Sequence, residues 1–288
     1  MRIIRDIADL PMSGGASGGA SGSASGGALV PTMGALHEGH RALIRRAAAS
    51  PHHPVVVSIF VNPTQFGPGE DYSRYPRTFG RDVELAGSAG AEVIFAPEVE
   101  TMYPPGEEIR VPQLPGVATA PGLEDGHRPG HFAGVCQVVA RLFDLLRPRI
   151  AVFGEKDYQQ LLVIRAIMAQ EAGRWGDLEI IAHETVREAD GLAMSSRNAY
   201  LATDDRQRAL GLCRALRAAQ GSITPGEAES AMRAILDEHD LAVDYAVVRD
   251  TATLMPVDDF AAPARALIAA RVGDVRLIDN APKRGAVV

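Results

Sequence analysis

Two histidines stand three positions apart at the start of a predicted helix, a place where proteins often bind phosphate. The segment His-Glu-Gly-His at residues 37–40 follows a glycine-containing turn and precedes apolar residues with helical spacing. His37 and His40 therefore project to one side of a first helical turn, where free N–H groups and about half a positive charge suit an anion. Their imidazoles could hold phosphate oxygens as charge develops during a displacement. A pair of solvated histidines is the alternative for this pattern alone, and the H-E-x-x-H spacing of a zinc site is absent.

Two basic segments offer further phosphate ligands. Lys156 lies in Gly-Glu-Lys-Asp at residues 154–157, at a predicted strand-to-helix turn, where its ammonium can reach the phosphates of a nucleotide. Arg197 ends Met-Ser-Ser-Arg at residues 194–197, where two hydroxyls and a guanidinium make a compact anion-binding loop. Each segment alone could be a solvated loop, but both favour contact with a polyanion.

Three neutral amide side chains occupy similar places at the ends of predicted strands or the start of a helix. Asn62 and Gln65 follow a predicted strand, and Gln160 lies one helical turn after Lys156. Amides suit the hydroxyls and carboxylates of a substrate without adding charge, although buried amides can also serve only to satisfy backbone groups. The sequence therefore predicts a small polar substrate next to the phosphate site.

The elements that must position these residues alternate between short apolar runs and amphipathic stretches. Strand-like runs occur at residues 29–30, 55–61, 93–95, 150–153 and 180–181. This alternation predicts an α/β fold with a Rossmann-like, doubly wound parallel sheet covered by helices on both faces. Ligands bind beyond the carboxyl ends of such strands, which is where the polar segments stand.

The C-terminal part predicts a smaller α/β domain, with a boundary near Arg187 and Glu188 that divides the chain into residues 1–187 and 188–288. Helical spacing at residues 203–220 and from Thr224 onward precedes strand-like runs at residues 243–248, 266–272 and 275–278. Near the other end, residues 13–28 are all glycine, serine or alanine, which predicts a flexible linker because the tract has almost nothing to bury.

Composition limits the class of protein. With 46% hydrophobic and 23% charged residues in 288, the chain can bury a sizeable core and is not disordered. The formal net charge of −7 disfavours a generic nucleic-acid partner, and no apolar run approaches the roughly 20 residues of a membrane span. No secretory signal pattern is present, and the two cysteines are too few for a disulfide framework. We expect a cytoplasmic protein with neither a membrane nor a nucleic-acid partner.

Together, and in this order, the polar segments are highly specific. Residues 31–40 (PTMGALHEGH), 58–63 (SIFVNP), 75–78 (YPRT), 153–160 and 190–198 resemble the pantothenate synthetases, the pantoate–β-alanine ligase family. The resemblance extends over nearly all of residues 29–280, including the closing RLIDN at residues 276–280. It departs at residues 13–28, where members of the family usually carry a helix.

The resemblance implies an ATP-dependent ligase, a cytoplasmic homodimer that makes pantothenate. Pantoate carboxylate attacks the α-phosphate of ATP, with Mg²⁺ expected to accompany it, and forms pantoyl adenylate and pyrophosphate. The amine of β-alanine then attacks the activated carbonyl and releases AMP, while the C-terminal domain acts as a lid.

The resemblance also assigns residues. The implied catalytic residues are His37, His40, Lys156 and Arg197, with His40 as a proton donor. Gln65 and Gln160 bind pantoate, Gln65 also lies at the β-alanine position, and Asn62 belongs to the same substrate set. No metal ligand is assigned. The ATP-binding residues are Met33, Gly34, Ala35, Leu36, His37, Glu38, Gly39, His40, Gly154, Glu155, Lys156, Asp157, Val186, Met194, Ser195, Ser196 and Arg197.

Two alternatives stay open from the sequence. One is another adenylyl- or cytidylyltransferase on the same scaffold, because histidines at this spacing do not name the acceptor. The other is a nucleotide-binding scaffold without catalysis, against which the combination of Lys156, His40 and Arg197 argues.

Overall fold

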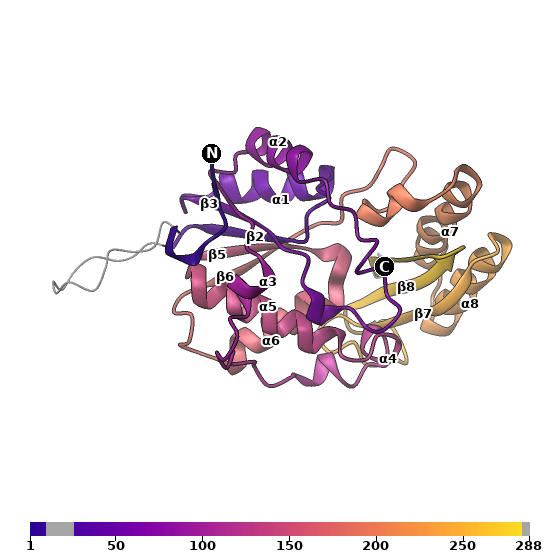
Figure 1. Ribbon diagram of the computed structural model, residues 1–288. Helices are drawn as coiled ribbons and strands as arrows, with labels where there is room; N and C mark the ends of the chain where they lie inside the picture. Colours follow the sequence, from indigo (N-terminus) through magenta and orange to yellow (C-terminus); the bar gives the residue numbers. More distant parts are fainter. Residues whose placement is uncertain (10–25, 284–288) are drawn as a thin grey trace.

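The computed structural model describes residues 1–9 and 26–283, which form two sheets with their helices (Figure 1). Residues 13–25 of the predicted linker lie outside the described residues. Ala28 is fully buried, and a Cβ added to Gly27 would lie 2.0 Å from the Pro54 carbonyl oxygen. The linker prediction is therefore wrong for residues 26–28, which pack into the fold and lead into a strand.

Six parallel strands form the larger sheet, in the order β1-β4-β3-β2-β5-β6. Strand order reverses between β2 and β5, so the carboxyl ends of these two neighbours flank a crevice at the switch point. The strands are β1 (Arg2–Ile4), β2 (Ala28–Thr32), β3 (Val55–Ile59), β4 (Val93–Phe95), β5 (Ile150–Gly154) and β6 (Glu179–His183).

Helices cover both faces of this sheet, as Figure 1 shows with α1 and α2 on one face and α5 and α6 on the other. Side chains alternate across a strand, so Val30 packs in the core beneath α1 and α2 while Leu29 packs in the core beneath α5 and α6. The predicted doubly wound α/β class is confirmed. The helices are α1 (Glu38–Ala48), α2 (Phe79–Ala89), α3 (Val99–Met102), α4 (Glu124–His127), α5 (His131–Leu146) and α6 (Tyr158–Gln170), with 3₁₀ helices η1 (Ile7–Asp9), η2 (Pro63–Gln65), η3 (Gly116–Ala118), η4 (Glu155–Asp157) and η5 (Ser196–Tyr200).

The smaller sheet is antiparallel, in the order β7-β8-β9, and α7 and α8 pack on it around a separate apolar core. Thr224 caps α8 by accepting from the Glu227 N–H, while Glu227 reaches back to the Thr224 N–H. The last strand runs to residue 283, beyond the predicted 278, because it pairs with β8 along its whole length. The division of the chain at residue 187 stays a prediction. The elements are α7 (Thr203–Gln220), α8 (Pro225–Glu238), β7 (Ala242–Asp250), β8 (Ala264–Val272) and β9 (Val275–Lys283).

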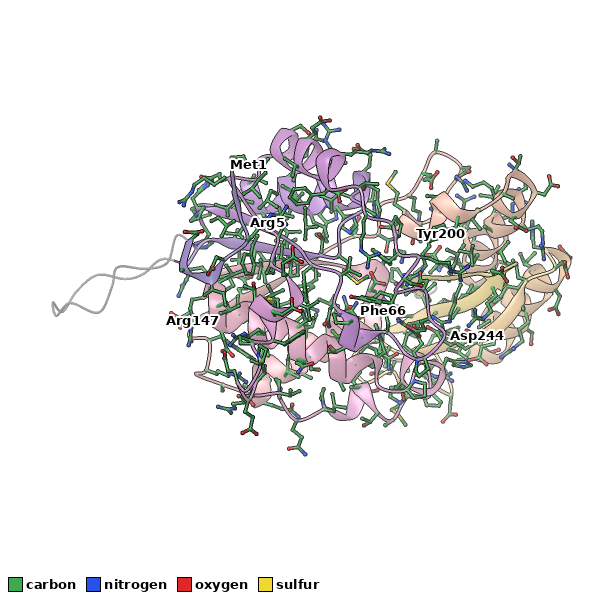
Figure 2. The ribbon with its side chains drawn as sticks, viewed as in Figure 1. Met1, Arg5, Phe66, Arg147, Tyr200 and Asp244 are labelled. Atoms are coloured by element: carbon green, nitrogen blue, oxygen red, sulfur yellow. The ribbon has the colours of Figure 1, made fainter. Side chains whose placement is uncertain are left out.

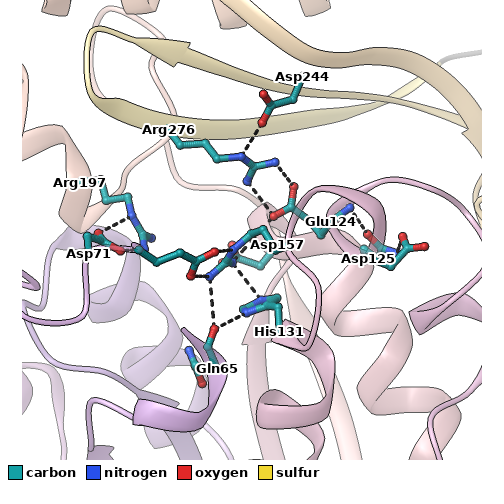
Figure 3. A network of polar contacts seen from close by, with 12 residues as sticks. Gln65, Asp71, Glu124, Asp125, His131, Asp157, Arg197, Asp244 and Arg276 are labelled. Carbon is teal, nitrogen blue, oxygen red and sulfur yellow. Dashed lines mark hydrogen bonds and ion pairs between the residues drawn. The ribbon is translucent and has the colours of Figure 1, made fainter. Parts of the chain in front are cut away.

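An ion pair with a buried carboxylate joins β9 of the smaller sheet to helix α4. The two parts of the molecule that this pair connects are seen in Figure 2, where Arg5 marks the side of the six-stranded sheet and Asp244 the side of the three-stranded sheet. Arg276 of β9 donates to both Glu124 carboxylate oxygens of α4 at 2.7 and 2.8 Å, and to Asp244 at 2.6 Å (Figure 3). The Tyr245 hydroxyl also donates to Glu124 at 2.9 Å, and Glu124 is only 6% exposed. The defined geometry of a bidentate pair thus fixes β9 against the N-terminal part of the chain.

Arg276→Met is expected to lower the free energy of unfolding by about 3 kcal/mol, because the buried Glu124 carboxylate loses its bidentate partner and keeps only Arg128, 3.9 Å away, as a cation. Arg149→Met removes the exposed Arg149–Asp177 pair and is the matched control, with an expected loss below about 1 kcal/mol. Urea unfolding of the three proteins measures both values. Equal losses in the two variants would show that the Arg276–Glu124 pair stabilises the fold no more than an exposed ion pair does.

Candidate active site

The two histidines at the start of α1 cap the helix with their own side chains. His37 Nδ1 accepts from the Gly39 N–H at 3.1 Å, and His40 Nδ1 accepts from the His37 N–H at 3.3 Å. A backbone N–H can only donate, so each Nδ1 carries a lone pair and a neutral ring holds its proton on Nε2. Both rings line the same cavity, with their centroids 4.1 Å apart. The cap thus selects the Nε2–H tautomer of each ring as a hydrogen-bond donor.

Burial and a nearby cation keep these rings neutral. Burial, followed by the charge of Lys156, lowers the pKa of His37 to about 4. The pKa of His40 is also lowered well below its ordinary value, by burial first and then by His37 and Lys156. Near pH 7 the pair therefore contributes oriented N–H dipoles and no net charge.

These shifts determine how stability depends on pH. Burial also lowers the pKa of His131 to about 4. As pH falls from about 6.5 to 4, the unfolded chain takes up protons at His37 and His131 that the folded protein does not, so stability present above pH 6.5 is progressively lost. The free energy of unfolding from urea titrations between pH 7.5 and 4.5 should decline in that window, and the decline should be smaller in His37→Asn. An equal slope in both proteins would contradict the assigned pKa of His37.

Lys156 is presented to the cavity by a loop that the C-terminal sheet holds. This loop is the 3₁₀ helix η4 that follows β5. The Asn280 side-chain N–H₂ of β9 donates to the carbonyls of Glu155 and Lys156 at 2.9 and 2.8 Å. The Lys156 ammonium lies 3.6 Å from Asp157. Glu155 points the other way and pairs with Arg265 of β8 at 3.0 Å. The Lys156 ammonium therefore lines the cavity, whereas the Glu155 carboxylate pairs with the C-terminal sheet.

The Met-Ser-Ser-Arg segment at residues 194–197 also lines the cavity. Ser196 Oγ donates to the Ala35 carbonyl at 3.0 Å, which ties this segment to the turn before α1. Arg197 forms a bidentate pair with Asp71 at 2.9 and 3.0 Å (Figure 3). Its guanidinium lies 5.7 Å from the centre of the Tyr75 ring. A phosphate that binds Arg197 must share it with Asp71 or displace that carboxylate.

Asn62, Gln65 and Gln160 line the cavity with neutral amide groups, which we call the amide-lined floor. Asn62 caps η2 and donates to Gln65 Oε1 at 3.3 Å and to the Gly134 carbonyl at 3.1 Å. His131 Nδ1 lies 2.9 Å from the Gln65 carbonyl (Figure 3), and Arg128 lies 3.1 Å from His131 Nε2. Because Arg128 can only donate, His131 Nε2 accepts and His131 Nδ1–H donates to Gln65. This chain of bonds fixes the backbone of Gln65 while its side chain borders the cavity.

Comparison with known proteins decides the family. A family model described as "Pantoate-beta-alanine ligase" matches residues 3–282. The chain belongs to the pantoate–β-alanine ligase family.

Relatives and solved structures from this ligase family are similar to this chain over most of its length. Pantothenate synthetase from Myxococcus xanthus is 52% identical over 261 residues, covering 88% of this chain and 87% of the relative. A crystal structure of pantothenate synthetase from Thermus thermophilus superposes with a TM-score of 0.86 at 43% identity, covering 98% of this chain and 99% of the other. A Francisella tularensis pantoate–β-alanine ligase, "complexed with beta-gamma ATP and beta-alanine", superposes with a TM-score of 0.77 at 31% identity and 98% coverage of both chains.

One cavity of about 220 Å³ brings together most of the residues predicted for the ligase site. His40, Lys156 and Arg197 come from three distant segments and all line it. The other predicted residues that line it are Met33, His37, Gly39, Asn62, Gln65, Gly154, Asp157, Gln160, Val186, Met194, Ser195 and Ser196.

Five predicted ATP-binding residues do not line the cavity: Gly34, Ala35, Leu36, Glu38 and Glu155. The N–H groups of Ala35 and Leu36 are already bonded to Asp82, and Glu38 pairs with Arg41 at the helix surface. The individual roles of all these residues stay predictions.

Some contacts around the cavity could not be predicted from the sequence. Asp71 is 126 positions from its partner Arg197, so no local pattern links them. Tyr75 and His131 stand in segments that carry motif or turn character, but nothing in their spacing indicates that they border the cavity. Only the folded chain shows these contacts.

Proposed function

We propose that the residues lining this cavity carry out both half-reactions of a pantoate–β-alanine ligase. The enzyme condenses pantoate with β-alanine at the expense of ATP, and yields pantothenate, AMP and pyrophosphate through pantoyl adenylate. The observation that carries the residue assignment is the convergence of His40, Lys156 and Arg197 on one cavity with an amide-lined floor. Family membership favours this ligase over another nucleotidyltransferase or a scaffold without catalysis.

In the first half-reaction, a pantoate carboxylate oxygen bonds to the α-phosphorus of ATP, and the bond from that phosphorus to the bridging oxygen of pyrophosphate breaks. Repulsion between the carboxylate and the polyphosphate opposes this step. The Lys156 ammonium offsets the repulsion, and the Nε2–H groups of His37 and His40 donate to phosphate oxygens as charge develops. Arg197 joins them when phosphate replaces Asp71 as its partner. His40 thus acts as a neutral donor of a hydrogen bond.

The metal accompanies the nucleotide in this proposal. Among the described residues, no group of three histidine, cysteine, aspartate or glutamate side chains is placed to hold a metal ion. Mg²⁺ is often bound through substrate phosphates with one or two carboxylates, and Asp157 is the carboxylate beside Lys156 at the cavity. When bound, Mg²⁺ would neutralise phosphate charge and orient the triphosphate.

In the second half-reaction, the amine nitrogen of β-alanine bonds to the acyl carbon, the acyl–phosphate oxygen bond breaks, and AMP leaves with that oxygen. The site must hold both reactants close and exclude water from a hydrolysable adenylate. Gln65 and Gln160 orient the pantoyl group, and the C-terminal part of the chain covers the opening as a lid. We include a homodimer and a cytoplasmic location in the proposal on the basis of the family. Among the described residues, no helix is long and apolar enough to cross a membrane.

Incubation with ATP and pantoate, without β-alanine, tests the assignment. We expect one equivalent of enzyme-bound pantoyl adenylate, a burst of pyrophosphate, and release of pantothenate when β-alanine is added. ATP binding without pyrophosphate release under saturating substrates would favour a scaffold. Turnover with other acids but not with pantoate would favour a different transferase.

A further inference from the structure

The turn between β2 and α1 contains two successive residues in the left-handed region of backbone space. Gly34 has φ +83° and Ala35 has φ +47°. Glycine adopts this region freely, but alanine does so at a cost because its Cβ crowds the backbone. The turn leads directly into the two histidines that cap α1, so something must hold Ala35 in this conformation.

A buried carboxylate from another helix holds the turn. Asp82 of α2 is 1% exposed, and its two oxygens accept from the Ala35 N–H at 2.9 Å and the Leu36 N–H at 2.8 Å. The Thr78 hydroxyl donates to the same carboxylate at 2.9 Å. No described basic side chain forms an ion pair with Asp82. The Asp82 carboxylate therefore accepts two backbone N–H groups of the turn and one hydroxyl, and an apolar residue at this position would leave both N–H groups without an acceptor.

The rest of the turn is equally fixed. The Gly34 N–H bonds to Thr32 Oγ1 at 3.2 Å, and the Ala35 carbonyl accepts from Ser196 of the Met-Ser-Ser-Arg segment at 3.0 Å. A Cβ on Gly34 would lie 3.1 Å from an Asp82 oxygen. The N–H groups of residues 34–36 are thus all occupied within the protein and are not donors for a ligand. The turn acts by placing the histidines at the start of α1.

We infer that Asp82 is a positioning residue for the ligase reaction. It holds residues 34–36 in the left-handed turn, and this turn sets where the Nε2–H groups of His37 and His40 point in the cavity. Asp82 itself does not line the cavity, so it acts through the turn. The inference deepens the proposed function and rests on it.

Asp82→Asn tests the inference. An asparagine can accept only one of the two N–H bonds, because its own N–H₂ group faces the other. We expect kcat for adenylate formation to fall about 10- to 100-fold, since a shift of about 1 Å in a catalytic group can cost that much. The KM for pantoate should change less than about threefold, because the amide floor that contacts it stands on other elements.

Ala35→Gly supplies the rescue. Glycine removes the Cβ penalty at this φ, so Asp82→Asn should cost at least about fivefold less in kcat in the Ala35→Gly background. Asp250→Asn is the matched control: Asp250 accepts from two backbone N–H groups and a threonine hydroxyl in a loop after β7, away from the cavity, and its loss should leave kcat unchanged.

A second variant covers the case in which Asp82→Asn does not fold. Ala35→Val leaves Asp82 intact but puts a β-branched side chain at positive φ, and it should also lower kcat at least about tenfold with little change in the KM for pantoate. Wild-type kcat in Asp82→Asn, or in Ala35→Val when Asp82→Asn fails to fold, would overturn the inference. Equal losses from Asp82→Asn in the wild-type and Ala35→Gly backgrounds would also overturn it. If wild-type enzyme forms no adenylate, the proposed function fails instead.

Discussion

Lys156→Ala is expected to lower the rate of adenylate formation about 10²- to 10³-fold, which is the usual cost of removing one preorganised charge donor. Lys156 lines the cavity in which, in the proposed reaction, a carboxylate approaches a triphosphate, and its nearest anionic partner, Asp157, is 3.6 Å away. It also contributes to the lowered pKa of both His37 and His40, which places its charge beside theirs. Rapid-quench measurement of pyrophosphate release with ATP and pantoate gives the rate of this step directly.

Two further lysine variants test whether the position and shape of the Lys156 cation matter for the rate. Lysine occurs only at positions 156 and 283, although lysine and arginine together number 29. Because the guanidinium is planar and forked whereas the ammonium is a compact point charge, Lys156→Arg should recover only part of the lost rate. Lys283→Ala is the control: its ammonium donates to the Gln220 carbonyl at 2.7 Å in the C-terminal part, and its loss should leave the rate unchanged. A Lys156→Ala enzyme within about threefold of wild type would remove Lys156 from the mechanism.

Local patterns in the sequence predict five of the six parallel strands, with β1 (Arg2–Ile4) missed, and the edge of the sheet where the candidate site lies. Apolar runs of strand length alternate with helical periodicity, and parallel strands bring their carboxyl ends to one edge. Lys156 after β5 and His40 after β2 therefore had to be close once β2 and β5 were neighbours. The family resemblance added the reaction, which periodicity and spacing could not supply.

Long-range pairing could not be predicted in the same way. Arg276 is 152 positions from Glu124, and Asp82 is 47 positions from Ala35 in the turn that it holds. Ion pairs and hydrogen bonds of this kind depend on how separate elements pack, and a single sequence carries no periodic signal for them. The same limit explains Glu155, whose segment favoured phosphate contact but whose carboxylate instead pairs with Arg265 from β8.

His40→Asn is expected to reduce adenylate formation about 10²- to 10³-fold while leaving the fold intact. The asparagine Oδ1 can replace Nδ1 as acceptor for the His37 N–H, so the helix cap survives. The variant has no counterpart of the Nε2–H that the cap directs into the cavity. The loss should therefore appear in kcat for the first half-reaction, with thermal stability close to that of wild type.

His40→Gln keeps the donor and loses the acceptor. Its amide N–H₂ reaches the position of Nε2, whereas its oxygen cannot accept from the His37 N–H in the same geometry. We expect it to retain more activity than His40→Asn and to be less stable. His53→Asn, at an exposed histidine paired with Glu92, is the control and should match wild type in both measurements. If the rate instead followed the stability of the two His40 variants, with the asparagine enzyme the more active, His40 would serve the cap alone. The opposite ranking of rate and stability is what separates a hydrogen-bond donor to phosphate from a residue that only begins a helix.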